Sequence, residues 1–242
     1  MAPITILSPH PDDAVLSLWR TLSGPGEVDV INVFAAVPDD GQPPGWWDRL
    51  TGSDDPVARA LERLEEDRDA LSRSGRVPRN LNFLDGQYRD APHPLDPLVE
   101  AVTAVLHRGA RVLVPAALGA HPDHATIRDV GVALGHLGFE VAFYADLPHA
   151  VTRDWPESVV RTSTSGAETR VDDLDETERR EKLAAVECYR TQVPELERVF
   201  AVLSRPEVLR YEIVWPYAGT APKRSAVTAS SASRSAATRS SP

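Results

Sequence analysis

The chain contains a single cysteine and no long apolar run. Cys188 has no second cysteine to pair with among the 242 residues, which excludes an intrachain disulfide and a cysteine-rich zinc site. No apolar stretch approaches the roughly 18 residues that a membrane-spanning helix requires. The first residues, Met1 to Ile4, lead directly into an apolar strand pattern instead of a signal peptide. We therefore expect a cytoplasmic protein without a membrane partner.

Positive charge is also scarce over most of the chain. The formal net charge is −10 at pH 7, and residues 218–242 hold four basic side chains and no acidic one. Removing those four leaves −14 on residues 1–217. Such an acidic body disfavours nucleic acid as a partner, because binding to phosphates needs a basic surface.

Large apolar side chains are almost absent from the end of the chain. Residues 218–242 are mostly Ser, Ala, Thr and Arg, and they cannot bury enough apolar surface to fold. The preceding residues have the length of one domain, and 42% of the chain is hydrophobic, which is enough for a core. We predict one domain over residues 1–217 and a disordered tail over 218–242.

Apolar runs alternate with amphipathic patterns along the domain. The strands that these runs predict cover residues 4–7, 28–34, 81–84, 111–115, 141–144 and 209–215. Helical patterns lie between most of them, and this order is typical of βαβ units. We therefore predict an α/β fold with a mostly parallel sheet and helices on both faces. The first turn has no Gly-x-Gly-x-x-Gly pattern, which argues against dinucleotide binding.

A polar turn with three candidate ligands follows the first expected strand. It contains His10, Asp12 and Asp13, and a helical pattern starts directly after it. In an open α/β sheet, ligands bind at the carboxyl ends of the strands. Imidazole nitrogen and carboxylate oxygen are ligands of zinc, so His10 and Asp13 could share an ion and leave Asp12 free as a base. Alternatively, an aspartate caps the helix and His10 is an ordinary loop residue.

The same arrangement occurs a second time. The strand pattern at 111–115 is followed by a loop of small residues, then by His121, Asp123 and His124 and another helical pattern. Two such clusters at the ends of two strands can meet at one site. His124 would supply a third protein ligand and leave open positions for water and substrate, as in catalytic zinc sites. His121 would then be a second imidazole near the metal.

The two tetrads, His-Pro-Asp-Asp at residues 10–13 and His-Pro-Asp-His at 121–124, resemble those of the LmbE-like, or PIG-L, zinc-dependent N-deacetylases. The segments at 144–148 and 182–192 also resemble this family. The resemblance spans roughly residues 3–217 and implies a Rossmann-like sheet. One difference is Ala14, where many members have Glu.

The resemblance also implies roles for the residues of the two tetrads. His10, Asp13 and His124 would hold Zn²⁺, although Fe²⁺ or Co²⁺ suits the same ligands. Asp12 would act as the general base, and His121 as a protonated partner of the developing oxyanion. For Asp123 two interpretations stay open, since it could hold His121 in its charged form or cap the following helix.

Five further residues are candidates for the substrate pocket. Trp46 and Trp47 lie in a long polar loop over residues 36–55, where they could stack on a sugar or fix the loop to the body. Arg63 could reach substrate or pair with a nearby glutamate on the helix surface. Asp146 and His149 follow the strand pattern at 141–144, where they could orient a metal ligand or contact substrate.

The function that the resemblance implies is metal-dependent removal of an N-acetyl, or short N-acyl, group from an amino sugar or a glycosylated small molecule. Its partner would be a small N-acetylated molecule, and the sequence leaves a homo-oligomer open. Two alternatives remain: a metal hydrolase that acts on a non-sugar amide, and a metal- or ligand-binding protein without catalysis. The presence of Asp12 and His121, which no metal requires, argues against the second.

Overall fold

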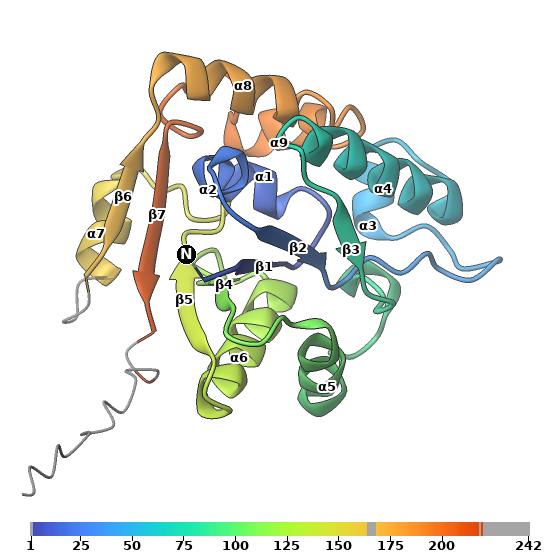
Figure 1. Ribbon diagram of the computed structural model, residues 1–242. Coiled ribbons are helices and arrows are strands. Elements are labelled where there is room, and N and C mark those ends of the chain that lie inside the picture. Colours follow the sequence, from blue (N-terminus) through green and yellow to red (C-terminus); the bar gives the residue numbers. More distant parts are fainter. Residues whose placement is uncertain (1, 164–167, 218, 220–242) are drawn as a thin grey trace, which may run out of the picture.

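The computed structural model describes residues 2–163, 168–217 and 219, and it forms an α/β fold around one sheet (Figure 1). The predicted tail, apart from residue 219, lies outside the described residues. The strands of the described part are β1 (Ile4–Ser8), β2 (Val28–Asn32), β3 (Pro78–Asn80), β4 (Arg111–Pro115), β5 (Glu140–Tyr144), β6 (Arg170–Asp173) and β7 (Tyr211–Pro216). Among these residues, no helix has the length and apolar character needed to cross a membrane.

The strands follow the order β3-β2-β1-β4-β5-β7-β6. The first five strands in this order run parallel to one another, and β7 runs antiparallel to both β5 and β6. At the centre of the sheet, Ile4 of β1 lies opposite Val28 of β2 and Arg111 of β4. The predicted mostly parallel sheet is confirmed.

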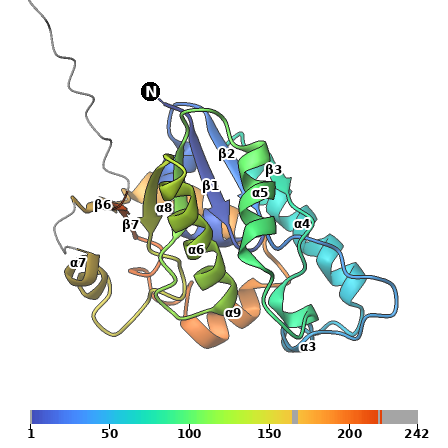
Figure 2. The ribbon, with the colours of Figure 1, turned by 90° about the horizontal axis from the view of Figure 1, so that it is seen from below.

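Helices cover both faces of the sheet, as the sequence predicts (Figures 1 and 2). One face carries α1 (Asp13–Ser17), α2 (Trp19–Ser23), α4 (Pro56–Ser72) and α8 (Glu176–Val186), and the other carries α5 (Leu95–Val105) and α6 (Pro122–His136). The remaining helices are α3 (Trp46–Leu50), α7 (Glu157–Ser163), α9 (Val193–Phe200) and a short 3-10 turn at Gly86–Tyr88. A separate apolar core lies on each face of the sheet.

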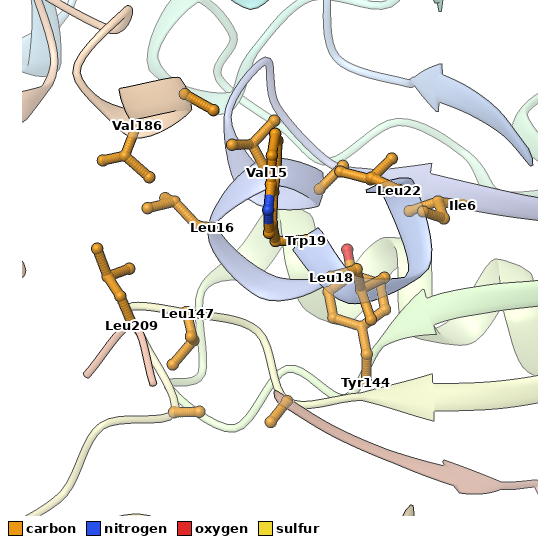
Figure 3. Close-up of a cluster of buried hydrophobic side chains, with 14 of the residues drawn as sticks. Ile6, Val15, Leu16, Leu18, Trp19, Leu22, Tyr144, Leu147, Val186 and Leu209 are labelled. Atoms are coloured by element: carbon orange, nitrogen blue, oxygen red, sulfur yellow. The ribbon is translucent and has the colours of Figure 1, made fainter. Parts of the chain in front are cut away.

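Trp19 lies at the centre of the larger core (Figure 3). It is almost fully buried, and apolar side chains from α1, α2, α8 and β1 surround it. Burial of such a side chain stabilises the fold by about 1.5–3 kcal/mol. Because α1 follows the first polar turn directly, this core also fixes the position of that turn.

The helical pattern after the first turn is divided into two short helices. The break falls at Leu18, and α2 begins at the next residue. The backbone amides of Trp19 and Arg20 donate to the carboxylate of Glu212, at 2.6 and 3.0 Å. Lys182 pairs with the same carboxylate at 2.8 Å, and both charged groups are buried. A buried carboxylate from β7 therefore caps α2, which the local sequence does not reveal.

Three local expectations differ from the structure. The short strand expected at 81–84 is β3 at Pro78–Asn80, and Asn82 forms only an isolated bridge with Phe34. The long loop over 36–55 contains the helix α3. The sequence does not predict the edge strand β6, because its residues are mostly polar. This segment is extended because it pairs with β7.

The order of the strands creates a crevice between β1 and β4. From β1 the chain proceeds outward to β2 and β3, and it later returns to β4 and continues to β5 on the other side. The loops after β1 and β4 therefore leave the sheet in different directions. Ligands of open α/β folds bind at such a switch point, and both polar tetrads lie there.

Candidate metal centre

The loops after β1 and β4 bring His10, Asp13 and His124 together. Each residue offers one ligand atom, and these atoms lie within 4.8 Å of one another. Nδ1 of His10 lies 3.5 Å from Oδ2 of Asp13, and Nε2 of His124 lies 3.4 Å from Oδ1 of Asp13. All three side chains are buried. The three residues expected as metal ligands therefore form one compact set.

The chemistry of these atoms suits a divalent ion. Two imidazole nitrogens and one carboxylate oxygen are ligands that zinc takes in proteins. Nε2 of His124 is buried and has no hydrogen-bond partner among the described residues. Burying a polar nitrogen without a hydrogen-bond partner or a bound ion destabilises the folded protein. The donor set and the unpartnered nitrogen both fit a metal ion.

Hydrogen bonds within the first turn hold the ligands in place. The Ser8 hydroxyl donates to the His10 carbonyl at 2.7 Å and accepts from the Ala14 amide at 3.1 Å. The His10 amide donates to Oδ2 of Asp13 at 2.9 Å. Asp12 has a φ of 141°, a conformation that costs a residue other than glycine about 1–3 kcal/mol. The surrounding bonds maintain this strained turn.

A carboxylate fixes the second nitrogen of each histidine ligand. Oδ2 of Asp146 lies 2.9 Å from Nδ1 of His124, and Oδ2 of Asp123 lies 3.1 Å from Nε2 of His10. Partners of this kind orient the ring and select which nitrogen faces the metal. His10 would thus bind through Nδ1, and His124 through Nε2. Asp146, which the sequence placed near the pocket, is fully buried behind the ligands.

A second group of candidate ligands consists of His10, His121 and Asp123, which also lie within 4.8 Å of one another. The carboxylate of Asp123 is already bound to His10, to the Gly86 amide at 2.9 Å and to the Arg89 guanidinium. Its oxygens therefore have partners in the protein. The first group, with the unpartnered nitrogen of His124, is the better metal site.

Asp12 faces the cavity beside the ligands and is 9% exposed. Burial and the neighbouring charge of Asp13 raise the pKa of Asp12 to about 8, against the opposing effect of Arg63. A carboxyl group with a raised pKa holds and releases protons near neutral pH. This environment suits the role of a general base and acid.

His121 lies among other imidazoles at the edge of the metal centre. Its Nδ1 accepts the Asp123 amide at 3.3 Å, which leaves the ring proton on Nε2. Burial, together with His10, His124 and His149, lowers the pKa of His121 to about 4. The Asp123 carboxylate binds His10 instead of His121. The Asp123 carboxylate thus contacts a metal-ligand candidate, and the role of His121 toward an oxyanion stays a prediction.

One cavity of about 220 Å³ connects these groups to the surface. Four of the five expected pocket residues line it: Trp46, Trp47, Arg63 and His149. Arg63 is buried and pairs with Asp85 at 3.1 Å, so it is not a surface residue. Imidazole rings and Phe200 surround His149.

Helix α9 forms a wall of the cavity that sequence reasoning missed. The residues that it contributes are Glu195, Leu196, Arg198, Val199 and Phe200. The sequence does indicate the helix itself, since Pro194 in the first turn favours a helix start and apolar side chains recur along the following residues. Nothing in that pattern placed the helix beside the two tetrads.

Comparison with solved structures reveals similar proteins. A triple mutant of a deacetylase of the teicoplanin biosynthetic pathway is 26% identical, with a TM-score of 0.72 over 89% of this chain and 97% of that one. A deacetylase of an antimicrobial pseudoaglycone is also 26% identical, with a TM-score of 0.68 and coverage of 89% and 96%. The resemblance to deacetylases is confirmed. No protein-family model and no curated protein matches the chain.

A more distant structure shares the fold alone. The N,N'-diacetylchitobiose deacetylase from Pyrococcus horikoshii is 17% identical, with a TM-score of 0.55 and coverage of 90% and 84%. One teicoplanin deacetylase structure, 25% identical and with a TM-score of 0.70, is described as a zinc-inhibited form. These deacetylases match this chain over most of its length.

Proposed function

We propose that this chain is a metal-dependent N-deacetylase, a hydrolase of linear amides that acts on an acetylated amino sugar or a glycosylated small molecule. The observation that carries the proposal is the unpartnered Nε2 of His124, which lies 3.4 Å from Asp13, a residue that lines the same cavity as Asp12. The similarity to deacetylases supports the class of reaction. Because one fold serves many chemistries, the site geometry carries more weight than the fold.

A divalent metal held by His10, Asp13 and His124 would supply Lewis acidity, polarising the amide carbonyl and lowering the pKa of water towards about 7. Zinc suits the two imidazoles and one carboxylate, and Fe²⁺ or Co²⁺ would fit the same ligands. Asp146 and Asp123 keep the two imidazoles in the required orientation.

The protein groups would then control the protons. Asp12 in its ionised form accepts a proton from the attacking water and returns it to the leaving nitrogen. His121 lines the cavity, and its Nε2–H would donate to the oxyanion that develops on the carbonyl oxygen. Arg63 adds positive charge to the wall of the same cavity. The products are a free amine and acetate.

The proposed setting is the cytoplasm, and the proposed partner is a small N-acetylated molecule. Neither nucleic acid nor a membrane is part of the proposal, because the net charge is −10 and the described residues contain no helix that could span a bilayer.

The first test compares metal content and activity. Purified protein is expected to contain about one divalent metal per chain, and His124→Ala is expected to lose it while staying folded, because a catalytic zinc needs three protein ligands. Amine release from methyl N-acetylglucosaminide then tests the reaction, with N-acetylated amino acids as the non-sugar comparison. Metal-loaded protein that hydrolyses only the amino acids would contradict the sugar assignment, and a metal-free protein would contradict the shared site.

A further inference from the structure

Arg89 is a largely buried cation that the proposed reaction does not use. Its side chain is 12% exposed and does not line the catalytic cavity. The guanidinium contacts the carboxylate of Asp123, which is buried in the first turn of α6. Asp123 in turn lies 3.1 Å from Nε2 of His10, while Nδ1 of the same ring faces Asp13 at 3.5 Å. A chain of contacts therefore connects Arg89 to the metal centre without passing through the cavity.

The position of Arg89 is itself fixed by its own loop. Nε donates to the Leu84 carbonyl at 3.2 Å, and Nη1 donates to the Ala91 carbonyl at 3.1 Å. The guanidinium carbon lies 5.1 Å from the centre of the buried Phe34 ring, which is within the range of a cation–π attraction. With Nε and Nη1 bound in this way, Nη2 has a defined direction, and it points at Asp123.

Both oxygens of the Asp123 carboxylate depend on the same loop. Oδ2, which faces His10, accepts the Gly86 amide at 2.9 Å, and Oδ1 contacts Arg89. A Cβ at Gly86 would lie only 3.0 Å from Oδ2, so the backbone of the loop approaches the carboxylate closely. Without Arg89, Asp123 would keep a buried charge without its counterion, which favours rotation of the carboxylate away from His10.

A second carboxylate lies beside the same nitrogen of His10. Oδ1 of Asp85 is 4.0 Å from Nε2 of His10, and Oδ2 of Asp85 pairs with Arg63 at 3.1 Å. A separation of 4.0 Å is too long for a hydrogen bond. Asp123 is therefore the acceptor that fixes the ring, and Arg89 is the cation that holds this acceptor.

We infer that Arg89 is a positioning residue of the metal centre, which holds the Asp123 carboxylate against Nε2 of His10 so that Nδ1 of that ring faces the metal. The inference rests on the proposed metal-dependent function and adds a residue outside both tetrads. It also sets the sign of the effect. Charge alone would make Arg89 unfavourable for a nearby divalent cation, because like charges repel. Positioning makes the same residue favourable.

Competition with a chromophoric chelator measures the zinc affinity of metal-stripped protein. Arg89→Met is expected to bind zinc at least about tenfold more weakly than the wild type, as is typical when an outer partner of a metal ligand is lost. Unchanged or tighter binding would overturn the inference and leave the metal centre intact. A wild type that binds no zinc would contradict the proposed function, and the inference with it.

The Asp123→Asn background tests whether Arg89 acts through Asp123. Asn keeps the shape of the side chain but has no charge for the guanidinium to hold. In this background Arg89→Met is expected to cause no further loss of zinc affinity, because residues that act through one contact are not additive. The same loss in both backgrounds would show that Arg89 acts by another route and would overturn the inference.

Arg89→Lys separates the contact with Asp123 from the structure of the loop. Lysine keeps the cation, but its single ammonium cannot also span the Leu84 and Ala91 carbonyls. Zinc affinity is expected to stay within about threefold of the wild type. A loss of about tenfold or more would assign the effect to the loop backbone and overturn the inference. This variant also decides the question if Arg89→Met does not fold.

Arg128→Met is the matched control. Arg128 lies on the same helix as Asp123, is 41% exposed and pairs with Asp129 at 2.9 Å. Loss of this cation is expected to leave zinc affinity at its wild-type value. A loss equal to that of Arg89→Met would show that the effect is not local to Asp123 and would overturn the assignment.

Discussion

Nε2 of His124 faces Oδ1 of Asp13 at 3.4 Å, and Nδ1 of the same ring lies 2.9 Å from Oδ2 of Asp146. The ring is fully buried between two carboxylates, one on the cavity side and one behind. Burial lowers the pKa of His124, but the two carboxylates outweigh it, and the net result is a raised pKa. A cation is therefore favoured at this position, and a divalent metal between Asp13 and His124 meets the same demand.

The contact between Asp146 and His124 predicts a loss of metal affinity in Asp146→Asn. The amide side chain keeps the shape but removes the charge that orients and polarises the ring. We expect affinity for zinc to fall about 10–100-fold, which is typical when such a partner is removed. Competition with a chromophoric chelator measures the change. Asp129→Asn, at an exposed position of α6 paired with Arg128, is the control and is expected to keep full affinity.

The position of Asp12 predicts that Asp12→Asn loses turnover but retains the metal. Asn tolerates a positive φ better than other residues, so the turn is expected to survive. Without a carboxylate to move protons, kcat is expected to fall about 10²–10⁴-fold. Metal analysis and steady-state kinetics on the same preparation check both parts. Unchanged kcat in metal-loaded Asp12→Asn would show that another group is the base.

The buried pair of Lys182 and Glu212 predicts a large stability effect. In Lys182→Met the Glu212 carboxylate would remain buried without its counterion, although it still caps α2. We expect a loss of about 3–5 kcal/mol in the free energy of unfolding, measured by urea denaturation. The double variant Lys182→Met, Glu212→Gln is expected to recover part of this loss. A double variant no more stable than the single one would argue against the uncompensated charge as the cause.

The raised pKa of Asp67 predicts that the free energy of unfolding falls as the pH rises from about 4 to 6. Burial raises its pKa to about 6, even though Tyr189 and Asn32 donate to its carboxylate at 2.7 Å. The folded protein therefore keeps a proton that the unfolded chain has lost between about pH 4 and 6. This stabilising contribution is present below pH 4 and is lost as the pH rises through 6, amounting to about 3 kcal/mol.

Urea denaturation of the wild type and Asp67→Asn at pH 4.5, 5.5 and 6.5 measures this contribution. Asn cannot titrate, so the wild type is expected to lose stability relative to the variant as the pH rises. Other groups titrate in both proteins, and their effects cancel in the difference. A difference that is constant over this range would show that Asp67 is ionised throughout.

The sequence alone predicted the sheet and the position of the two tetrads. Apolar runs that end in polar turns are local patterns, and the carboxyl ends of parallel strands meet at one edge by the geometry of the sheet. The strands β1, β4 and β5 therefore agree closely with the expectation. For the same reason His10, Asp13 and His124 were expected together, and the structure brings them together.

Tertiary packing decided what surrounds those ligands. The contact of Asp123 with His10 joins residues 113 positions apart, and the bond between Trp47 and Gln192 joins residues 145 positions apart. Local pattern carries no information about such pairs, because helix and strand periods extend over only a few residues. The lowered pKa of His121 and the α9 wall of the cavity follow from this packing, since burial and neighbouring charge exist only in the folded chain.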